Sequence, residues 1–107
     1  MGFKRKGSRV QVSRSGRLQR GSIGAACRVL DVSDSGVRIE SRLFVRSGDV
    51  LQLVVELDHG EMLTCALEVV HVRAPRFGAR ITLITPEGQA QLAHIFDDQL
   101  QKNFSRH

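Results

Sequence analysis

The chain has 107 residues, a formal net charge of +5 and 41% hydrophobic residues, with neither Trp nor Tyr. A chain of this length can bury one hydrophobic core but not two, so we expect a single domain. No segment approaches the roughly 18 consecutive apolar residues of a membrane-spanning helix. The basic N-terminus is not followed by the apolar stretch of a secretory signal. We therefore expect a cytoplasmic protein that does not insert into a membrane.

The charge is divided unevenly along the chain. Residues 1–30 carry eight basic side chains and no acidic one, whereas residues 31–107 carry eight basic and eleven acidic side chains. Such a basic segment favours a partner that carries phosphate groups. A solvated basic tail that only improves solubility fits the charge equally well.

The first third of the chain predicts a basic arm followed by strands. Residues 1–8 contain two glycines, a serine and three positive charges, and we expect a flexible arm there. The folded domain is expected over residues 9–107. It begins with a short strand-like alternation, and residues 13–16, Ser-Arg-Ser-Gly, predict a turn. The apolar segment 25–30 and the strand-like segment 37–40 enclose a cluster of turn-forming residues.

The middle of the chain carries the clearest strand pattern. Apolar residues alternate with polar ones over 51–57, and Asp58-His59-Gly60 predicts a hairpin turn. The return strand places Leu63, Cys65, Leu67 and Val69 on one face.

A change of phase follows at Val70 and Val72, which predicts a β-bulge or burial on both faces near there. Ala74-Pro75-Arg76 predicts the next turn. The last strand is expected over 77–84, with Ala79, Ile81 and Leu83 alternating on one face.

The C-terminal segment predicts one helix over about 86–103. Thr85 is a favourable N-cap, Pro86 fits the first helical position, and Glu87 suits the positive end of the helix dipole. Apolar residues recur at helical spacing: Leu92, Ile95, Phe96, Leu100 and Phe104.

This order of elements predicts the fold class. About six antiparallel strands precede a single helix, and no alternation of strands and helices indicates a parallel sheet. We expect a mainly β protein, a closed or nearly closed six-stranded antiparallel barrel of the split-barrel type. The helix is expected to cover one opening with Leu92, Ile95, Phe96 and Leu100.

No catalytic or metal site is predicted. The two cysteines, Cys27 and Cys65, sit in apolar runs and are interpreted as small buried hydrophobes. The four histidines lack metal-ligand spacing, and Ser33 has no neighbouring base that would activate it. The glycines form no phosphate-binding loop of nucleotide hydrolases. We therefore expect neither an enzyme nor a protein with a bound cofactor.

Two short motifs stand out because of their separation. Arg5 and Arg9 lie four residues apart, and Asp31-x-Ser33-x-x-Gly36 follows 22 residues after Arg9. This separation allows one excursion out and back, so the motifs can meet at one end of a barrel. Taken singly, the arginines could be solvated charges and the second motif an ordinary turn.

These five residues are where the sequence resembles the PilZ family of cyclic di-GMP receptor domains. The family pattern is Arg-x-x-x-Arg, then twenty-odd residues, then Asp or Asn-x-Ser-x-x-Gly. Arg5, Arg9, Asp31, Ser33 and Gly36 match its defined positions. The resemblance covers roughly residues 4–100.

The resemblance implies a cyclic di-GMP site made by these five residues, and their chemistry suits that ligand. Arginine can bind phosphate with two N–H groups, bind the guanine edge or stack on the base. Asp31 can accept hydrogen bonds from guanine, and Ser33 offers a hydroxyl donor. Gly36 would allow a positive φ and a close approach of the backbone.

Lys4, His71 and Gly78 are weaker candidates for ligand contacts. In this family, the residue before the first arginine is thought to influence whether one or two stacked ligands bind, and Lys4 would suit a stacked pair. His71, seven residues before Gly78, could stack on a guanine, although a solvent-facing histidine fits equally well.

The function implied is that of a receptor that transmits second-messenger levels to a partner protein. In this hypothesis the basic arm becomes ordered as Arg5 and Arg9 close on the ligand. Motility, exopolysaccharide production and biofilm control are all typical of the family. The alternatives are a ligand-independent interaction module and a non-specific nucleic-acid binder, although the scarcity of aromatic residues disfavours the latter.

Overall fold

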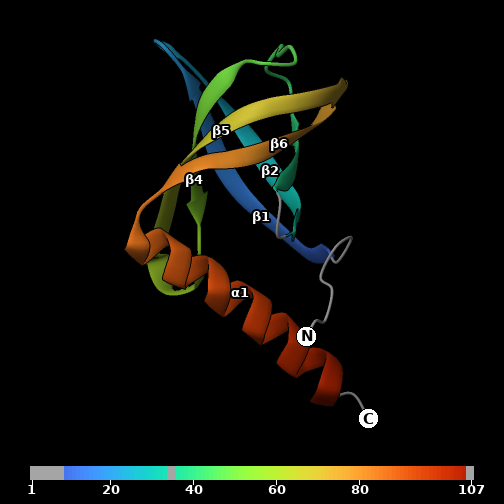
Figure 1. Ribbon diagram of the computed structural model, residues 1–107, viewed down its shortest axis with the longest axis vertical. Helices are drawn as coiled ribbons and strands as arrows, with labels where there is room; N and C mark the ends of the chain where they lie inside the picture. Colours follow the sequence, from blue (N-terminus) through green and yellow to red (C-terminus); the bar gives the residue numbers. More distant parts are fainter. Residues whose placement is uncertain (1–8, 34–35, 106–107) are drawn as a thin grey trace.

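The computed structural model describes residues 9–33 and 36–105 and confirms the predicted architecture (Figure 1). A closed six-stranded barrel is followed by one helix, and every pair of neighbouring strands is antiparallel. Around the barrel the strands follow the order β1-β2-β3-β6-β5-β4. The elements are β1 (Arg9–Arg20), β2 (Ile23–Ser33), β3 (Val37–Ser41), β4 (Val50–Glu56), β5 (Met62–Arg73), β6 (Arg76–Ile84) and α1 (Pro86–Ser105), with a 3-10 turn η1 (Asp58–Gly60) between β4 and β5.

The core fills the interior of the barrel with aliphatic side chains. The predicted alternation in β4 and β5 is confirmed, since every second residue is buried and the residues between are more exposed. The buried residues are Leu51, Leu53, Val55, Leu63, Cys65, Leu67 and Val69. In β5 the buried face continues through Val69. The most deeply buried apolar side chains are Leu18, Ile39, Leu51, Leu53, Leu67 and Val69.

The turn predicted over residues 13–16 is wrong, because β1 runs unbroken through this segment. Ser13 has a φ of 48°, and the register against β2 shifts between Gln11 and Arg14, so the segment contains a β-bulge. Gly16 does not turn the chain. A Cβ atom on it would lie 2.7 Å from the carbonyl oxygen of Val54, so glycine here allows β4 to approach and close the barrel.

The bulge predicted near Val70 is confirmed by a register shift between Val69 and His71. The inward placement of Leu83 is wrong, since 72% of this residue is exposed. Ile81 pairs with Leu67 and Leu83 pairs with the adjacent Ala66, so a second bulge changes the phase of β6. Because a one-residue shift reverses the faces of a strand, Leu83 points outward.

The helix begins as predicted and ends two residues later than expected. The Thr85 hydroxyl oxygen accepts a hydrogen bond from the backbone N–H of Gly88 at 3.0 Å, which confirms the N-cap. Leu92 packs against the core, and with Ile95 it lines the end of the barrel interior. Figure 1 shows α1 across that end. The side chains of Phe96 and Leu100 lie outside the described part of the structure. Among the described residues, no helix is long and apolar enough to cross a membrane.

Candidate functional site

The strand register brings the described residues of the two sequence motifs together on the outside of the barrel. Arg9, the first residue of β1, is the cross-strand partner of Ser33 at the end of β2. Val32 pairs with Val37 of β3, which in turn pairs with Ala79 in the middle of β6. Four neighbouring strands therefore contribute to one surface, and β5 extends it through the pair between His71 and Gly78.

A buried carboxylate between two arginines forms the charged centre of this surface. Arg9 Nη1 donates to Asp31 Oδ1 at 2.7 Å, and Arg38 donates to Asp31 Oδ2 from Nε at 3.0 Å and from Nη2 at 2.8 Å. Only 2% of Asp31 is exposed. The side chains of Arg9 and Arg38 are 49% and 46% exposed, respectively. Asp31 therefore fixes one edge of each guanidinium and leaves the assembly with a net positive charge facing solvent.

Sequence reasoning did not assign Arg38 to the site. Its signal is the cross-strand pair with Asp31, because residues opposite one another in an antiparallel pair share a face. The register between β2 and β3 shifts between Val29 and Asp31. That shift cannot be read from hydrophobic alternation alone.

Ser33 and Gly36 close the connection between β2 and β3. The backbone N–H of Ser33 donates to the carbonyl oxygen of Gly36 at 2.8 Å, and the Ser33 hydroxyl donates to the same oxygen at 3.4 Å. A Cβ atom on Gly36 would collide with the backbone carbonyl of Ala79. Glycine is therefore required here for the close approach of β6.

His71 lies directly over Gly78 on the neighbouring strand. A Cβ atom on Gly78 would stand 2.8 Å from Cε1 of the imidazole, so the missing side chain makes room for the ring. His71 is exposed. The pair thus presents a flat ring supported from below by glycine backbone, an arrangement suited to stacking.

Arg9, the β2–β3 connection and the pair of His71 and Gly78 surround an open pocket of about 260 Å³. Arg80, which lines the pocket, donates from Nη2 to Glu68 Oε1 at 2.6 Å. Asp31 does not line the pocket but lies beneath Arg9 and Arg38. Lys4 and Arg5 lie outside the described residues. The lining comprises the predicted Arg9, Ser33, Gly36, His71 and Gly78, together with Val37, Val70, Ala79 and Arg80.

The two cysteines lie away from this pocket. Burial raises the pKa of the Cys65 thiol to about 11. Burial likewise raises the pKa of Cys27 to about 11, although the nearby Arg17 charge opposes the shift. Both thiols are therefore protonated at neutral pH, which fits small packing side chains rather than nucleophiles.

The barrel, its single helix and the arginine-lined surface define a small β-barrel binding domain. The sequence matches the PilZ domain family over residues 3–98, so the chain belongs to that family. No curated protein sequence matches it.

Solved structures share the fold. The chain superposes on the Bacillus subtilis inhibitor of motility, MotI/DgrA, with a TM-score of 0.72 and 18% sequence identity, covering 88% of this chain and 50% of that one. It therefore spans about half of the MotI chain. The PilZ domain of CeSA from a cellulose-synthesizing bacterium gives a TM-score of 0.65 and 14% identity, with 89% and 97% of the two chains covered. At these identities the likeness establishes the fold alone.

Proposed function

We propose that this PilZ domain is a receptor for cyclic di-GMP that passes the second-messenger signal to a partner protein. The observation that carries this proposal is the convergence of Arg9, Ser33, Gly36 and His71 on one open pocket. These residues come from four different strands or their connections. Their convergence supports a ligand that combines phosphate with an aromatic base.

The chemistry of the pocket suits such a ligand in two parts. The half-exposed guanidinium of Arg9, held on one edge by Asp31, can donate its remaining N–H groups to a phosphate. The imidazole of His71 can stack on a guanine. Pockets that enclose a whole drug-sized ligand are typically about 300–1,000 Å³. A volume of about 260 Å³ suits one base with its phosphate rather than a complete cyclic dinucleotide.

Asp31 has two possible roles, and the geometry favours the indirect one. Both of its oxygens already accept hydrogen bonds from arginines, and it lies below the pocket surface. We propose that Asp31 first holds Arg9 and Arg38 in position. It would contact a guanine directly only if one of these side chains moved away.

Arg5, in the segment before β1, is the second arginine that we propose binds the ligand. It lies four residues before Arg9 and outside the described residues. We propose that residues 1–8 close over the bound ligand and that this closure is read by the partner. Hydrogen exchange tests the step: cyclic di-GMP should increase the protection of residues 1–8, and unchanged protection would contradict the closure.

The family and the names of the structural neighbours suggest the pathways in which a partner could act. MotI is named as an inhibitor of motility, and the CeSA domain comes from a cellulose-synthesizing bacterium. We propose control of motility or of exopolysaccharide production, and with it biofilm formation, as the output.

Calorimetric titration with ligand analogues tests the proposed specificity. Cyclic di-GMP should bind saturably, whereas GTP and the linear dinucleotide pGpG should bind far more weakly, because only the cyclic ligand presents both phosphates in a fixed ring. Equal binding of all three with a steep loss of affinity in salt would indicate a non-specific nucleic-acid binder. No binding by the folded protein would favour the ligand-independent interaction module.

A further inference from the structure

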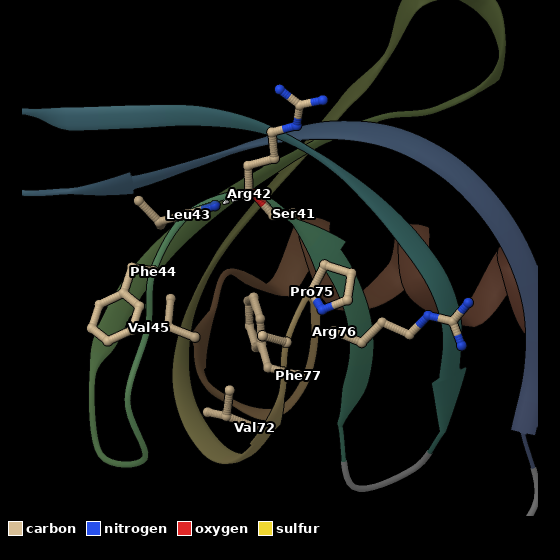
Figure 2. A pocket seen from close by; sticks show the side chains of 10 residues that line it. Ser41, Arg42, Leu43, Phe44, Val45, Val72, Pro75, Arg76 and Phe77 are labelled. Carbon is tan, nitrogen blue, oxygen red and sulfur yellow. Dashed lines mark hydrogen bonds between the residues drawn. The ribbon is translucent and has the colours of Figure 1, made fainter.

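A second open pocket lies at the tip of the β5–β6 hairpin, separate from the site described above. It has a volume of about 410 Å³ and lies between this hairpin and the connection from β3 to β4. Figure 2 shows Val45, Val72 and Phe77 around its centre and Phe44 at one side, with the guanidinium groups of Arg42 and Arg76 pointing away from the centre. We call this pocket the hairpin groove.

The hairpin groove has a buried apolar floor and an exposed aromatic wall. Val45 and Phe77 belong to the buried core and form the floor. Phe44 stands at the side with 71% of the residue exposed, and Val72 is also exposed. An aromatic side chain on the surface next to an apolar hollow is typical of a protein-binding site, because burying it on association is favourable.

The rim of the groove is basic. Arg42 and Arg76 line the groove, Arg46 lies 5.9 Å from the centroid of the Phe44 ring, and Arg73 ends β5 beside the hairpin turn. Within the described residues, only Arg76 of these four approaches a carboxylate, at 4.0 Å from Glu40, which is too long for a hydrogen bond.

The nearby acid Asp49 does not neutralise this rim. Its carboxylate accepts hydrogen bonds from Arg20 at 3.0 Å and from the backbone N–H of Arg46 at 2.9 Å. Asp49 therefore stabilises its own loop and binds the C-terminal end of β1. The rim keeps a surplus of positive charge around an apolar hollow.

We propose that the hairpin groove is a docking site for an acidic segment of a partner protein that also carries large apolar side chains. An apolar side chain would fill the hollow beside Phe44, and carboxylates would meet the rim arginines. A second copy of this chain fits less well, because a twofold interface would place the arginine rim against itself. A lipid surface fits less well because the apolar floor is recessed.

The hairpin groove and the pocket beside Arg9 are both lined by residues of β5 and β6. Val70 and His71 line the pocket beside Arg9, and Val72 lines the groove. The Ser47 hydroxyl donates to the carbonyl oxygen of Val70 at 2.8 Å, which ties the groove's loop to the strand of the other pocket. Adjacent residues of the β5–β6 hairpin therefore belong to the two sites. The docking proposal rests on the groove itself and does not require nucleotide binding.

A phage-displayed library of random 16-residue peptides tests the proposal, with selection on the wild-type protein and counter-selection on a Phe44→Ala variant. Selected peptides should combine a net negative charge with aromatic or large aliphatic residues. A synthetic peptide of the selected sequence should bind at least tenfold more weakly to Phe44→Ala and to Arg42→Glu. Arg42→Lys, which keeps the charge, should retain most of the affinity.

Leu83→Ala is the matched control, because Leu83 is exposed to the same degree as Phe44. The hairpin groove lies at the Arg76 end of β6, whereas Leu83 lies at the other end of that strand. It should bind the peptide like the wild type, and circular dichroism should show that every variant is folded. Peptides without negative charge, or equal losses in Leu83→Ala and Phe44→Ala, would overturn the proposal. So would Phe44-dependent dimerisation in light scattering, or Phe44-dependent cosedimentation with phosphatidylserine vesicles in the absence of any selected peptide.

Discussion

Arg9 Nη1 lies 2.7 Å from Asp31 Oδ1 and thereby joins the first residue of β1 to the end of β2. Arg38 binds the other oxygen of the same carboxylate. Because the Asp31 side chain is buried while both guanidiniums are half exposed, the carboxylate orients two cations toward solvent. This relationship links the stability of the barrel end to its proposed ligand chemistry.

Removing the Asp31 carboxylate should destabilise the domain. Asp31→Ala leaves both arginines without their shared acceptor, and we expect a loss of about 1–3 kcal/mol in the free energy of unfolding. Urea unfolding measures this loss. Glu68→Ala is the control, since it breaks a more exposed ion pair with Arg80 and should cost less than about 1 kcal/mol. Equal losses in the two variants would show that Asp31 contributes no more than a surface ion pair.

Gly36→Ala should weaken the contact between the β2–β3 connection and β6. The new methyl group collides with the carbonyl of Ala79, which is backbone and cannot rotate away. We expect a loss of about 1–3 kcal/mol or more in thermal or urea unfolding. Gly24→Ala is the matched control, since its nearest neighbour is the flexible end of the Arg17 side chain at 3.3 Å. Similar stability of the two variants would contradict the close approach as the reason for Gly36.

If His71 stacks on a guanine, then His71→Ala should weaken cyclic di-GMP binding. Base–aromatic stacking contributes about 1–3 kcal/mol, which corresponds to a rise in Kd of roughly 5-fold to 150-fold. His71→Phe should keep most of the affinity, because a flat ring is retained over Gly78. His94→Ala, on the exposed side of α1, should bind like the wild type. An unchanged Kd in His71→Ala would remove this residue from the site.

The raised thiol pKa values predict a loss of stability at alkaline pH. Burial raises the pKa of Cys65 in the folded protein to about 11 from an ordinary thiol value of 9.0, so the folded state keeps a proton that the unfolded state loses, and stability falls as pH rises above 9. We expect this thiol to account for about 1–2 kcal/mol between pH 8.5 and 11. Because the chain has no Tyr, phenol ionisation cannot contribute. Urea unfolding across this range should show a shallower decline in Cys65→Ala, and parallel declines would contradict the assignment.

Local alternation was enough to predict the buried faces of β4 and β5, and the Thr85-Pro86 pair marked the start of α1. The change of phase at Val70 also marked the bulge in β5, but the bulge in β1 and the one that turns Leu83 outward could not be placed from alternation. Ser13 to Gly16 carries residues typical of a turn, yet Arg14, Ser15 and Gly16 pair with β2, so β1 continues past the bulge at Ser13. Leu83 fails for a similar reason, because the bulge that turns it outward depends on its pairing with β5.

The candidate site likewise has a part that the sequence predicted and a part that depends on strand register. The spacing of the two motifs was sufficient to bring Arg9 to Ser33 and Gly36, since one hairpin returns the chain to its start. Arg38 and Arg80 required the register of β3 and β6, which sequence alternation leaves undetermined. The burial of Asp31 beneath two arginines is likewise a tertiary property.

The most direct test of the receptor function is calorimetric titration of cyclic di-GMP into the wild type and the Arg5→Ala/Arg9→Ala double variant. Arg28→Ala serves as the control, because it removes an exposed β2 guanidinium that does not line the pocket. We predict saturable binding by the wild type and by Arg28→Ala, and none by the double variant at the same concentrations. Equal binding by the double variant, or no binding by the folded wild type, would contradict the proposed site.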